Sequence, residues 1–184
     1  MNLDHYFNFI VHETKYDWIY EFNQTSDDFV GLTNQKCEIT KWLHDENDDH
    51  QALLIMGPTG SGKTSLTQML CVENHIQFYC RDSRNKRSKK DLQIYFETIK
   101  GCRKSILIMD EMEILDYGEY MGISDIQSWL KENHATKKNI RIIFIVLSLH
   151  EKKMKDFSKW CKFIYFDYPT KDEWLCRCSN DFLI

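Results

Sequence analysis

The sequence predicts an α/β domain with a mainly parallel, five-stranded sheet. Five short apolar runs of strand length alternate with segments of helical periodicity along the 184 residues, which is the order of elements in parallel α/β folds. Three of the runs are continuously apolar, as expected for strands that are covered on both faces. Glycine (7) and proline (2) are too scarce for an all-β fold with many turns.

The N-terminal half of this domain is predicted to alternate helix and strand twice. Thr33–Leu43 has a partly apolar face at helical spacing and predicts a helix. The apolar run Ala52–Met56 stops at Gly57 and predicts a buried strand. Lys63–Glu73 again shows helical spacing, and Ile76–Cys80 is predicted to be the second strand.

The C-terminal half continues this alternation. Ser124 and Thr170 are each followed three residues later by Gln or Glu, which is the capping-box pattern of a helix start. Gly101 is a plausible residue just past a helix end. The predicted helices are Lys90–Lys100, Ser124 to about Asn133, Glu151–Trp160 and a last one from Thr170, and the predicted strands are Ser105–Met109, Ile140–Leu147 and Lys162–Phe166.

Composition and charge exclude several classes of protein. The chain carries 24 basic and 28 acidic residues, a net charge of −4, so it is not a uniformly basic nucleic-acid coat. No apolar run approaches the ~20 residues that span a bilayer, and the first residues lack the pattern of a signal peptide. The seven cysteines form no CxxC pair, which favours reduced thiols in an intracellular protein over a disulfide framework or a zinc site.

Residues 57–64 match the phosphate-loop pattern G-x-x-x-x-G-K-[ST], between a predicted strand and a predicted helix. Glycines allow a tight turn whose N–H groups point at phosphate oxygens, and the helix N-terminus adds positive dipole character. Lys63 is predicted to reach the β- and γ-phosphates, and the Thr64 hydroxyl is predicted to bind Mg²⁺. The nucleotide-binding residues predicted in this segment are Gly57, Pro58, Thr59, Gly60, Ser61, Gly62, Lys63, Thr64 and Ser65.

Polar side chains follow two other predicted strands. Asp110 and Glu111 come directly after the apolar run that ends at Met109. Asp110 is predicted to hold the Mg²⁺ shell, and Glu111 to activate the water that attacks the γ-phosphate. Ser148 ends the longest apolar run. It either bonds near the γ-phosphate or merely ends the strand and caps the next helix, and the sequence favours neither.

A basic stretch follows the second predicted strand, with six cations among residues 81–90 against one acid. Such a run is usually a solvated helix face, and the residues alone favour that interpretation. The alternative is a surface that follows a nucleic-acid phosphate backbone. The candidate DNA-binding residues in this stretch are Arg84, Arg87, Lys89 and Lys90.

With these motifs in view, the chain resembles the ATPase domain of clamp loaders in the AAA+ superfamily, above all the replication factor C large subunit. The sequence has no Ser-Arg-Cys arginine finger, which favours the large subunit over a small one. The N-terminal segment also lacks the family's usual proline. The segments that carry the resemblance are Trp18–Phe22, Phe29–Gly31, Gly57–Thr64, Ser83–Leu92, Leu107–Glu111 and Trp160–Phe166 with Pro169.

The resemblance implies a P-loop NTPase (AAA+) three-layer sandwich. Its implied parts are an N-terminal segment at 1–30, the ATPase core at 31–168 and the beginning of a truncated helical lid at 169–184. ATP and Mg²⁺ are the implied ligands, with ATP between Val30–Gly31 and the phosphate loop and with Ser148 as a sensor residue. The implied partners are other clamp-loader subunits, a sliding clamp and primer-template DNA. The implied location is the nucleus in a eukaryote, and otherwise the cytoplasm or a viral replication site.

Three functions therefore compete. The first is a clamp-loader-like ATPase in DNA replication or repair, with weak hydrolysis when partner subunits are absent. The second is another AAA+ or P-loop ATPase, such as a chaperone or helicase loader, in which the basic stretch is plain surface. The third is a nucleotide-gated binding module without turnover. A small-molecule kinase is disfavoured because Asp110, Glu111 and Ser148 fit attack by water.

Overall fold

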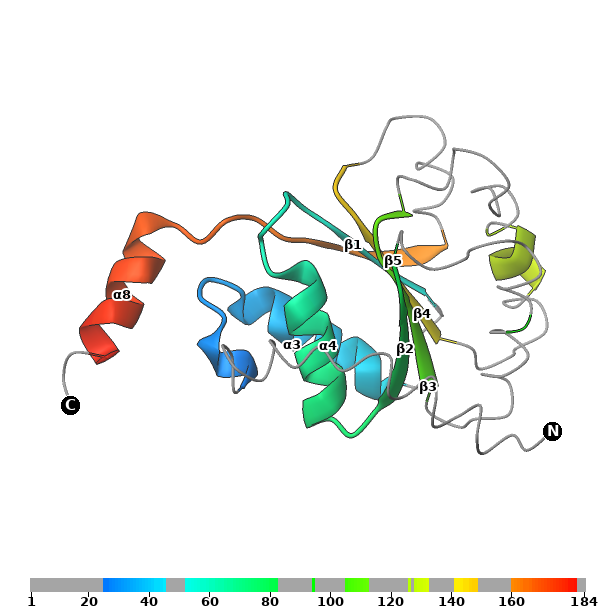
Figure 1. Ribbon diagram of the computed structural model, residues 1–184, viewed down its shortest axis with the longest axis horizontal. Coiled ribbons are helices and arrows are strands. Elements are labelled where there is room, and N and C mark those ends of the chain that lie inside the picture. The colour runs from blue at the N-terminus through cyan, green and yellow to red at the C-terminus, as the bar shows by residue number, and fades with distance from the viewer. Residues whose placement is uncertain are drawn as a thin grey trace.

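The computed structural model describes residues 25–45, 52–82, 94, 105–112, 126, 128–132, 141–148 and 160–181. Figure 1 shows the described elements along the chain, from blue to red. In chain order they are the 3-10 turn η1 (Ser26–Asp28), α3 (Thr33–His44), β1 (Ala52–Met56), α4 (Lys63–Glu73), β2 (Gln77–Arg81), β3 (Ser105–Met109), β4 (Arg141–Val146), β5 (Cys161–Tyr165) and α8 (Lys171–Asp181).

The five strands form one sheet in the order β2-β3-β4-β1-β5, and all neighbouring strands are parallel. Met56 at the end of β1 is paired with Val146 of β4 on one side and with Tyr165 of β5 on the other. The carboxyl ends of the strands therefore meet at one edge of the sheet. The loop after β1 leaves this edge between the ends of β4 and β5, at a point where the strand order reverses. The predicted α/β fold is confirmed.

Both faces of the sheet are buried, which explains why its strands are continuously apolar. Leu53 and Ile55 of β1 face a core that also contains Trp42 of α3. Leu54 of the same strand faces a second core together with Phe144 of β4. Figure 1 shows α3 and α4 on the same side of the sheet. Successive residues of one strand thus serve opposite cores, as the pleat of a strand requires.

Arg141, the first residue of β4, connects the sheet to the end of α3. Its guanidinium lies over the Trp42 ring, 3.9 Å from the ring centroid. It also donates a 2.8 Å hydrogen bond to the Leu43 carbonyl and another to the Trp42 carbonyl. The last carbonyls of a helix have no intrahelical donor, and a cation there complements the helix dipole. Arg141 therefore fixes α3 against the strand next to β1.

Most of the predicted elements that lie in the described residues are confirmed, but both ends of three strands were wrong by one residue. β2 begins at Gln77 instead of Ile76, because Ile76 closes the end of α4. β5 ends at Tyr165, although the next residue, Phe166, is fully buried and therefore looks like a strand residue in the sequence. β4 ends before Leu147, which is exposed.

The helix predicted from Thr170 is α8, and its capping box is present. The Thr170 backbone N–H donates to the Glu173 carboxylate at 2.7 Å, and the Glu173 N–H donates to the Thr170 hydroxyl at 3.3 Å. Figure 1 shows α8 at the end of a long connection that leads away from the sheet. The domain boundaries at residues 30 and 168 stay predictions. The helices predicted over Lys90–Lys100 and Glu151–Trp160 lie outside the described residues, apart from Ile94 and Trp160.

The described cysteines are all free thiols. Burial raises the pKa of Cys71 and that of Cys161 to about 12, so both thiols stay neutral near pH 7. Across the described ranges, no group of three or more His, Cys, Asp and Glu side chains could hold a metal ion. No helix in the described part of the chain is long and apolar enough to cross a membrane.

α4 ends in a left-handed residue that is not glycine. The φ angle of His75 is +55°. The Ile76 N–H bonds to the Cys71 carbonyl at 2.8 Å, and the His75 N–H bonds to the Val72 carbonyl at 3.0 Å. This is the Schellman motif, whose left-handed position is usually glycine. A residue with a Cβ atom costs about 1–2 kcal/mol in this conformation.

We expect His75→Gly to raise the free energy of unfolding by about 0.5–1 kcal/mol. Glycine adopts the left-handed conformation without Cβ strain, and its larger chain entropy cancels part of the gain. The expected increase in Tm is roughly 1–4 °C by thermal unfolding. The matched control is His75→Ala, which keeps the Cβ atom and should show no increase. Equal stability of the two variants would contradict the argument.

Candidate nucleotide-binding site

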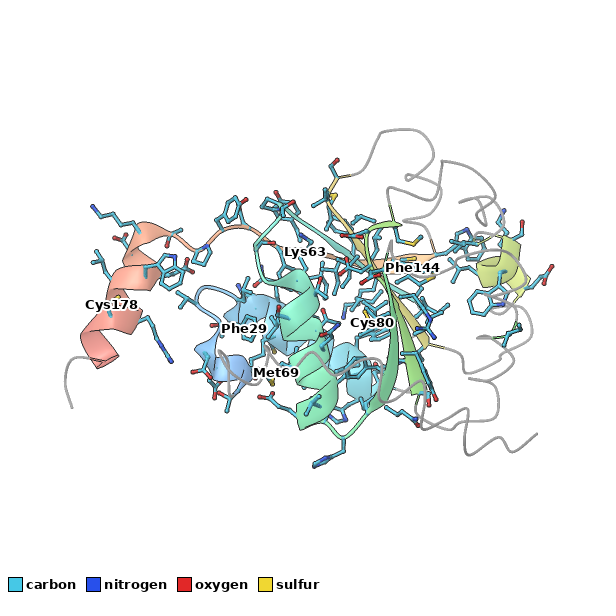
Figure 2. All side chains as sticks on the ribbon, in the orientation of Figure 1. Phe29, Lys63, Met69, Cys80, Phe144 and Cys178 are labelled. Atoms are coloured by element: carbon cyan, nitrogen blue, oxygen red, sulfur yellow. The ribbon has the colours of Figure 1, made fainter. Side chains whose placement is uncertain are left out.

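The loop between β1 and α4 forms the centre of the candidate site. Gly62 is the N-cap residue of α4, with a φ of +85°, so the helix begins at Lys63. Figure 2 shows Lys63 at the top of α4, where the loop enters the helix. The unpaired N–H groups of a first helical turn and the positive end of the helix dipole together bind anions. The predicted phosphate loop therefore has the local geometry that its sequence requires.

Two glycines of the loop allow other segments to approach it closely. A Cβ atom on Gly57 would lie 2.2 Å from the carbonyl oxygen of Phe166, which no side chain could tolerate. A Cβ atom on Gly62 would lie 3.4 Å from the side chains of Phe29 and Leu32. The loop is thus enclosed between the chain that follows β5 and the segment that precedes α3.

Lys63 is buried inside the loop, with 7% of its surface exposed. Its ammonium donates hydrogen bonds to the carbonyls of Gly57 at 2.8 Å and Pro58 at 2.7 Å. The Ser61 hydroxyl also donates to the Pro58 carbonyl, at 2.8 Å. A buried ammonium is costly unless it is hydrogen-bonded. The loop therefore holds a positive charge at its centre, within reach of any anion that the loop binds. The predicted residue Ser65 is half-buried in the first turn of α4.

The strongest link in the site joins Thr64 of α4 to Asp110 at the end of β3. The Thr64 hydroxyl donates a 2.6 Å hydrogen bond to the Asp110 carboxylate, across 46 residues of sequence. These two side chains are the predicted ligands of Mg²⁺, and the structure brings them together. Hydroxyl and carboxylate oxygens are the ligands that Mg²⁺ prefers. The residues present therefore fit a magnesium ion at this position.

Without a bound cation, the charged form of the Asp110 side chain is electrostatically unfavourable in the folded protein. Burial raises its pKa, and the negative charge of Glu111 acts in the same direction. Hydrogen bonds from the Thr64 hydroxyl and the Glu111 N–H, and the positive charge of Lys63, oppose this rise without cancelling it. The folded protein therefore binds a proton at Asp110 more tightly than the unfolded chain does. As pH rises from the unfolded value through the folded pKa, ionisation of this group reduces the stability of the fold.

Glu111 has a strained backbone beside this carboxylate. Its φ angle is +53°, a left-handed conformation that a residue with a side chain seldom adopts. Its N–H donates to the Asp110 carboxylate at 2.8 Å, and its own side chain is exposed. Such strain persists where the surrounding structure imposes it, and it clusters at functional sites. Glu111, which is predicted to activate water, is therefore held in a left-handed backbone conformation at the edge of the sheet.

Ser148 lies at the same edge of the sheet. It is exposed and follows the end of β4 by two residues. The pairing of Met56 with Val146 places it beside the first residues of the phosphate loop. This position permits a contact with a bound phosphate. Its other predicted role, as a cap of the next helix, depends on residues outside the described ranges.

Val30 and Gly31 are the residues that, with the phosphate loop, were predicted to enclose ATP. The φ angle of Gly31 is +73°. A Cβ atom on Gly31 would lie 2.9 Å from the Glu173 carboxylate and 3.2 Å from the Cα of Pro169. The chain at Gly31 is therefore packed directly against the start of α8, as well as lying close to the loop through Phe29.

Sequence reasoning missed the contacts that hold this segment in place. The Ser26 N–H donates to the Glu73 carboxylate of α4 at 2.6 Å. Asp27 forms an ion pair with Lys36 of α3. Asp28 accepts a 2.8 Å hydrogen bond from Arg177 of α8. η1 thus contacts three helices, and the Thr-x-x-Asp capping box at its start was the one signal that could have revealed it.

The predicted DNA-binding residues Arg84, Arg87, Lys89 and Lys90 all lie outside the described residues. Their role in DNA binding therefore stays a prediction. Among the described residues, the predicted phosphate loop and the predicted Mg²⁺ ligands Thr64 and Asp110 lie together at one edge of the sheet.

Comparison with known proteins supports this assignment. A family model, the ATPase family associated with various cellular activities (AAA), matches residues 53–155. This stretch is more than half of the chain and contains both the phosphate loop and the Asp110–Glu111 pair.

Curated relatives match shorter parts of the chain. Disease resistance protein RGA5 of Oryza sativa subsp. japonica is 36% identical over 69 residues, which cover 37% of this chain and 6% of that protein. The replication factor C large subunit of Pyrococcus horikoshii is 34% identical over 90 residues, which cover 46% of this chain and 19% of that protein. The matches thus span less than a fifth of the length of either relative.

A solved structure supports the fold. A chain from work on the structural basis for katanin self-assembly superposes with a TM-score of 0.62 at 17% identity, over 86% of this chain and 58% of that chain. Similarity at this level of identity shows the fold alone. Together with the family match and the five-stranded parallel sheet, it confirms the predicted P-loop NTPase fold.

We expect Asp110→Asn to raise the stability of the ligand-free protein and to weaken Mg²⁺-dependent nucleotide binding. The amide has the shape of the carboxyl without its buried charge, so the protein without ligands should unfold at a higher Tm than wild type at pH 7–8. Toward pH 4 the difference should shrink, because protonation of Asp110 in wild type removes the same charge. Mg²⁺-dependent nucleotide affinity should fall roughly 10–100-fold, by analogy with changes around other metal sites.

The measurements are thermal unfolding across this pH range and nucleotide titration with and without Mg²⁺. Glu38→Gln, a change at an exposed carboxylate of α3, is the control and should alter neither quantity. A lower Tm for Asp110→Asn at pH 7–8 would show that the buried charge is fully compensated, which contradicts the argument.

Proposed function

The chain belongs to the AAA family of ATPases, and from this premise we propose that it binds ATP with Mg²⁺ at residues 57–64 and hydrolyses the γ-phosphate. The observation that carries the proposal is the 2.6 Å hydrogen bond between the Thr64 hydroxyl and Asp110. It joins the helix start that would bind phosphates to the acid that would hold the metal shell. The strained, exposed Glu111 directly after this acid supports turnover in addition to binding.

The position of each of these side chains supports a specific role in the reaction. Lys63 would exchange its two carbonyl partners for oxygens of the β- and γ-phosphates. Thr64 and Asp110 would hold Mg²⁺, which when bound supplies positive charge against the phosphate oxygens. Glu111 would accept a proton from the attacking water, and Ser148 would orient that water from the end of β4.

The finer proposal is a clamp-loader-like subunit that acts on primer-template DNA with partner subunits and a sliding clamp. The similarity to the replication factor C large subunit of Pyrococcus horikoshii supports it, as do the sequence segments that resemble that family. The DNA part of the proposal rests on the basic stretch at residues 81–90. Because other subunits would supply charge-stabilising groups, hydrolysis by this chain alone is expected to be slow.

Two substitutions test ATP hydrolysis. Glu111→Gln should lower phosphate release by about 100-fold or more while ATP binding is kept, because the amide cannot accept a proton from water. Lys63→Ala should lower both binding and turnover, because it removes the charge at the centre of the loop. Phosphate release is measured at saturating ATP and Mg²⁺, with and without primed DNA, and binding is measured by titration with a fluorescent ATP analogue.

The control is Glu38→Gln on the exposed side of α3, which should leave both quantities unchanged. If Glu111→Gln turns over ATP at the wild-type rate, the assignment of Glu111 as the catalytic base is wrong. If the wild-type chain binds ATP but releases no phosphate even when partner subunits are added, the nucleotide-gated binding module is the correct function.

A charge reversal tests the DNA-binding part. The double variant Arg87→Glu, Lys89→Glu should weaken binding to primed DNA at all sequences, and it should reduce the slope of log affinity against log salt by roughly two. ATP affinity should not change. The control is Lys41→Glu on the exposed side of α3. Unchanged DNA affinity and unchanged salt dependence would favour an AAA ATPase whose basic stretch is plain surface.

A further inference from the structure

Tyr168 connects the chain after β5 to the phosphate loop. Its hydroxyl donates a 2.8 Å hydrogen bond to the carbonyl oxygen of Thr59, a residue 109 positions earlier in the chain. Its own backbone N–H is held by the Asp167 carboxylate, also at 2.8 Å. No motif marks Tyr168 in the sequence, and the functional assignments above give it no part.

A loop binds an anion through its N–H groups, so the orientation of each of its peptide units matters. The carbonyls of Gly57 and Pro58 accept hydrogen bonds from Lys63, and that of Thr59 accepts one from Tyr168. In a trans peptide unit the C=O and the following N–H point in opposite directions. Because the Thr59 carbonyl points to Tyr168, the Gly60 N–H points away from Tyr168.

Packing does not hold this peptide unit in place. Gly60 has a φ of +80°, and no heavy atom of the described residues beyond its two chain neighbours lies within 4 Å of its Cβ position. Gly57 and Gly62, by contrast, lie against Phe166 and Leu32. A glycine in open space rotates with little steric cost. The hydrogen bond from Tyr168 is thus the described interaction that restrains the unit between Thr59 and Gly60.

We propose that Tyr168 is a positioning residue for phosphate binding, which fixes the Thr59–Gly60 peptide unit so that the Gly60 N–H faces a bound phosphate. This inference rests on the proposed nucleotide binding and adds a residue to it. A preorganised donor raises affinity because its orientation does not have to be restricted during binding. The contribution is that of one neutral hydrogen bond at a partly exposed position.

The test is Tyr168→Phe, which removes only the hydroxyl. Affinities for ADP and for inorganic pyrophosphate, measured by displacement of a fluorescent ADP analogue, should both fall by the same factor, roughly three- to tenfold. The two losses should agree because pyrophosphate has no base and meets only the phosphate loop. The Tm without ligand should stay close to that of wild type.

A second measurement reports on the peptide unit itself. The chain has seven glycines, so labelling with ¹⁵N-glycine gives a simple NMR spectrum in which the Gly60 amide can be followed. Tyr168→Phe should broaden the Gly60 resonance or speed its hydrogen exchange. The matched control is Tyr165→Phe, an exposed tyrosine of β5 that should leave the affinities and the Gly60 resonance unchanged.

Arg177→Ala separates this role from simple anchorage of α8, because Arg177 ties α8 to η1 through hydrogen bonds to Asp27 and Asp28. If this variant reproduces the loss of pyrophosphate affinity, anchorage is the cause and the proposal is overturned. Wild-type affinities in Tyr168→Phe would also overturn it, and the proposed nucleotide binding would then stand. If the wild-type chain binds neither ADP nor pyrophosphate, both fail together.

Discussion

The hydrogen bond between the Thr64 hydroxyl and the Asp110 carboxylate is the interaction on which the site depends. Thr64 belongs to the helix after β1, and Asp110 to the end of β3, with β4 between the two strands. The bond can form only if the strands are parallel and end at the same edge. The same arrangement puts the end of β4, and with it Ser148, between the phosphate loop and the acidic pair. The order and direction of the strands therefore determine which side chains meet at the site.

Several features around this bond reduce the stability of the protein when no ligand is bound. Burial raises the pKa of Asp110, Lys63 is a buried cation that must be satisfied by backbone carbonyls, and Glu111 has a left-handed backbone. Each of these features costs free energy by itself. Together they place a cation, an anion and an exposed carboxylate in the phosphate loop and at the end of β3. Ligands of complementary charge would relieve these costs, which is how strained sites achieve binding.

The sequence predicted the parts of the site that local chemistry dictates. The loop at residues 57–64 and the acidic strand end could be predicted because each follows a strand buried on both faces, which is apolar at every position. The ends of the strands could not be predicted to the residue. Phe166 is buried beyond the end of β5, and burial alone does not reveal where hydrogen-bonded pairing stops. The contacts of Tyr168 and Arg177 could not be predicted, because they join residues with no periodic pattern across more than 100 positions.

The same reasoning explains where specificity for a partner must reside. The proposed nucleotide chemistry would be common to AAA proteins of different function, because one fold hosts many functions. Partner recognition therefore falls to residues that can change without disturbing the sheet edge. Arg81, the first residue of the basic stretch, is buried at the end of β2, where its carbonyl accepts the Asp110 N–H at 2.8 Å. If the proposed DNA contact forms at this stretch, its residues are covalently joined to β2, the neighbour of the strand that ends before Asp110.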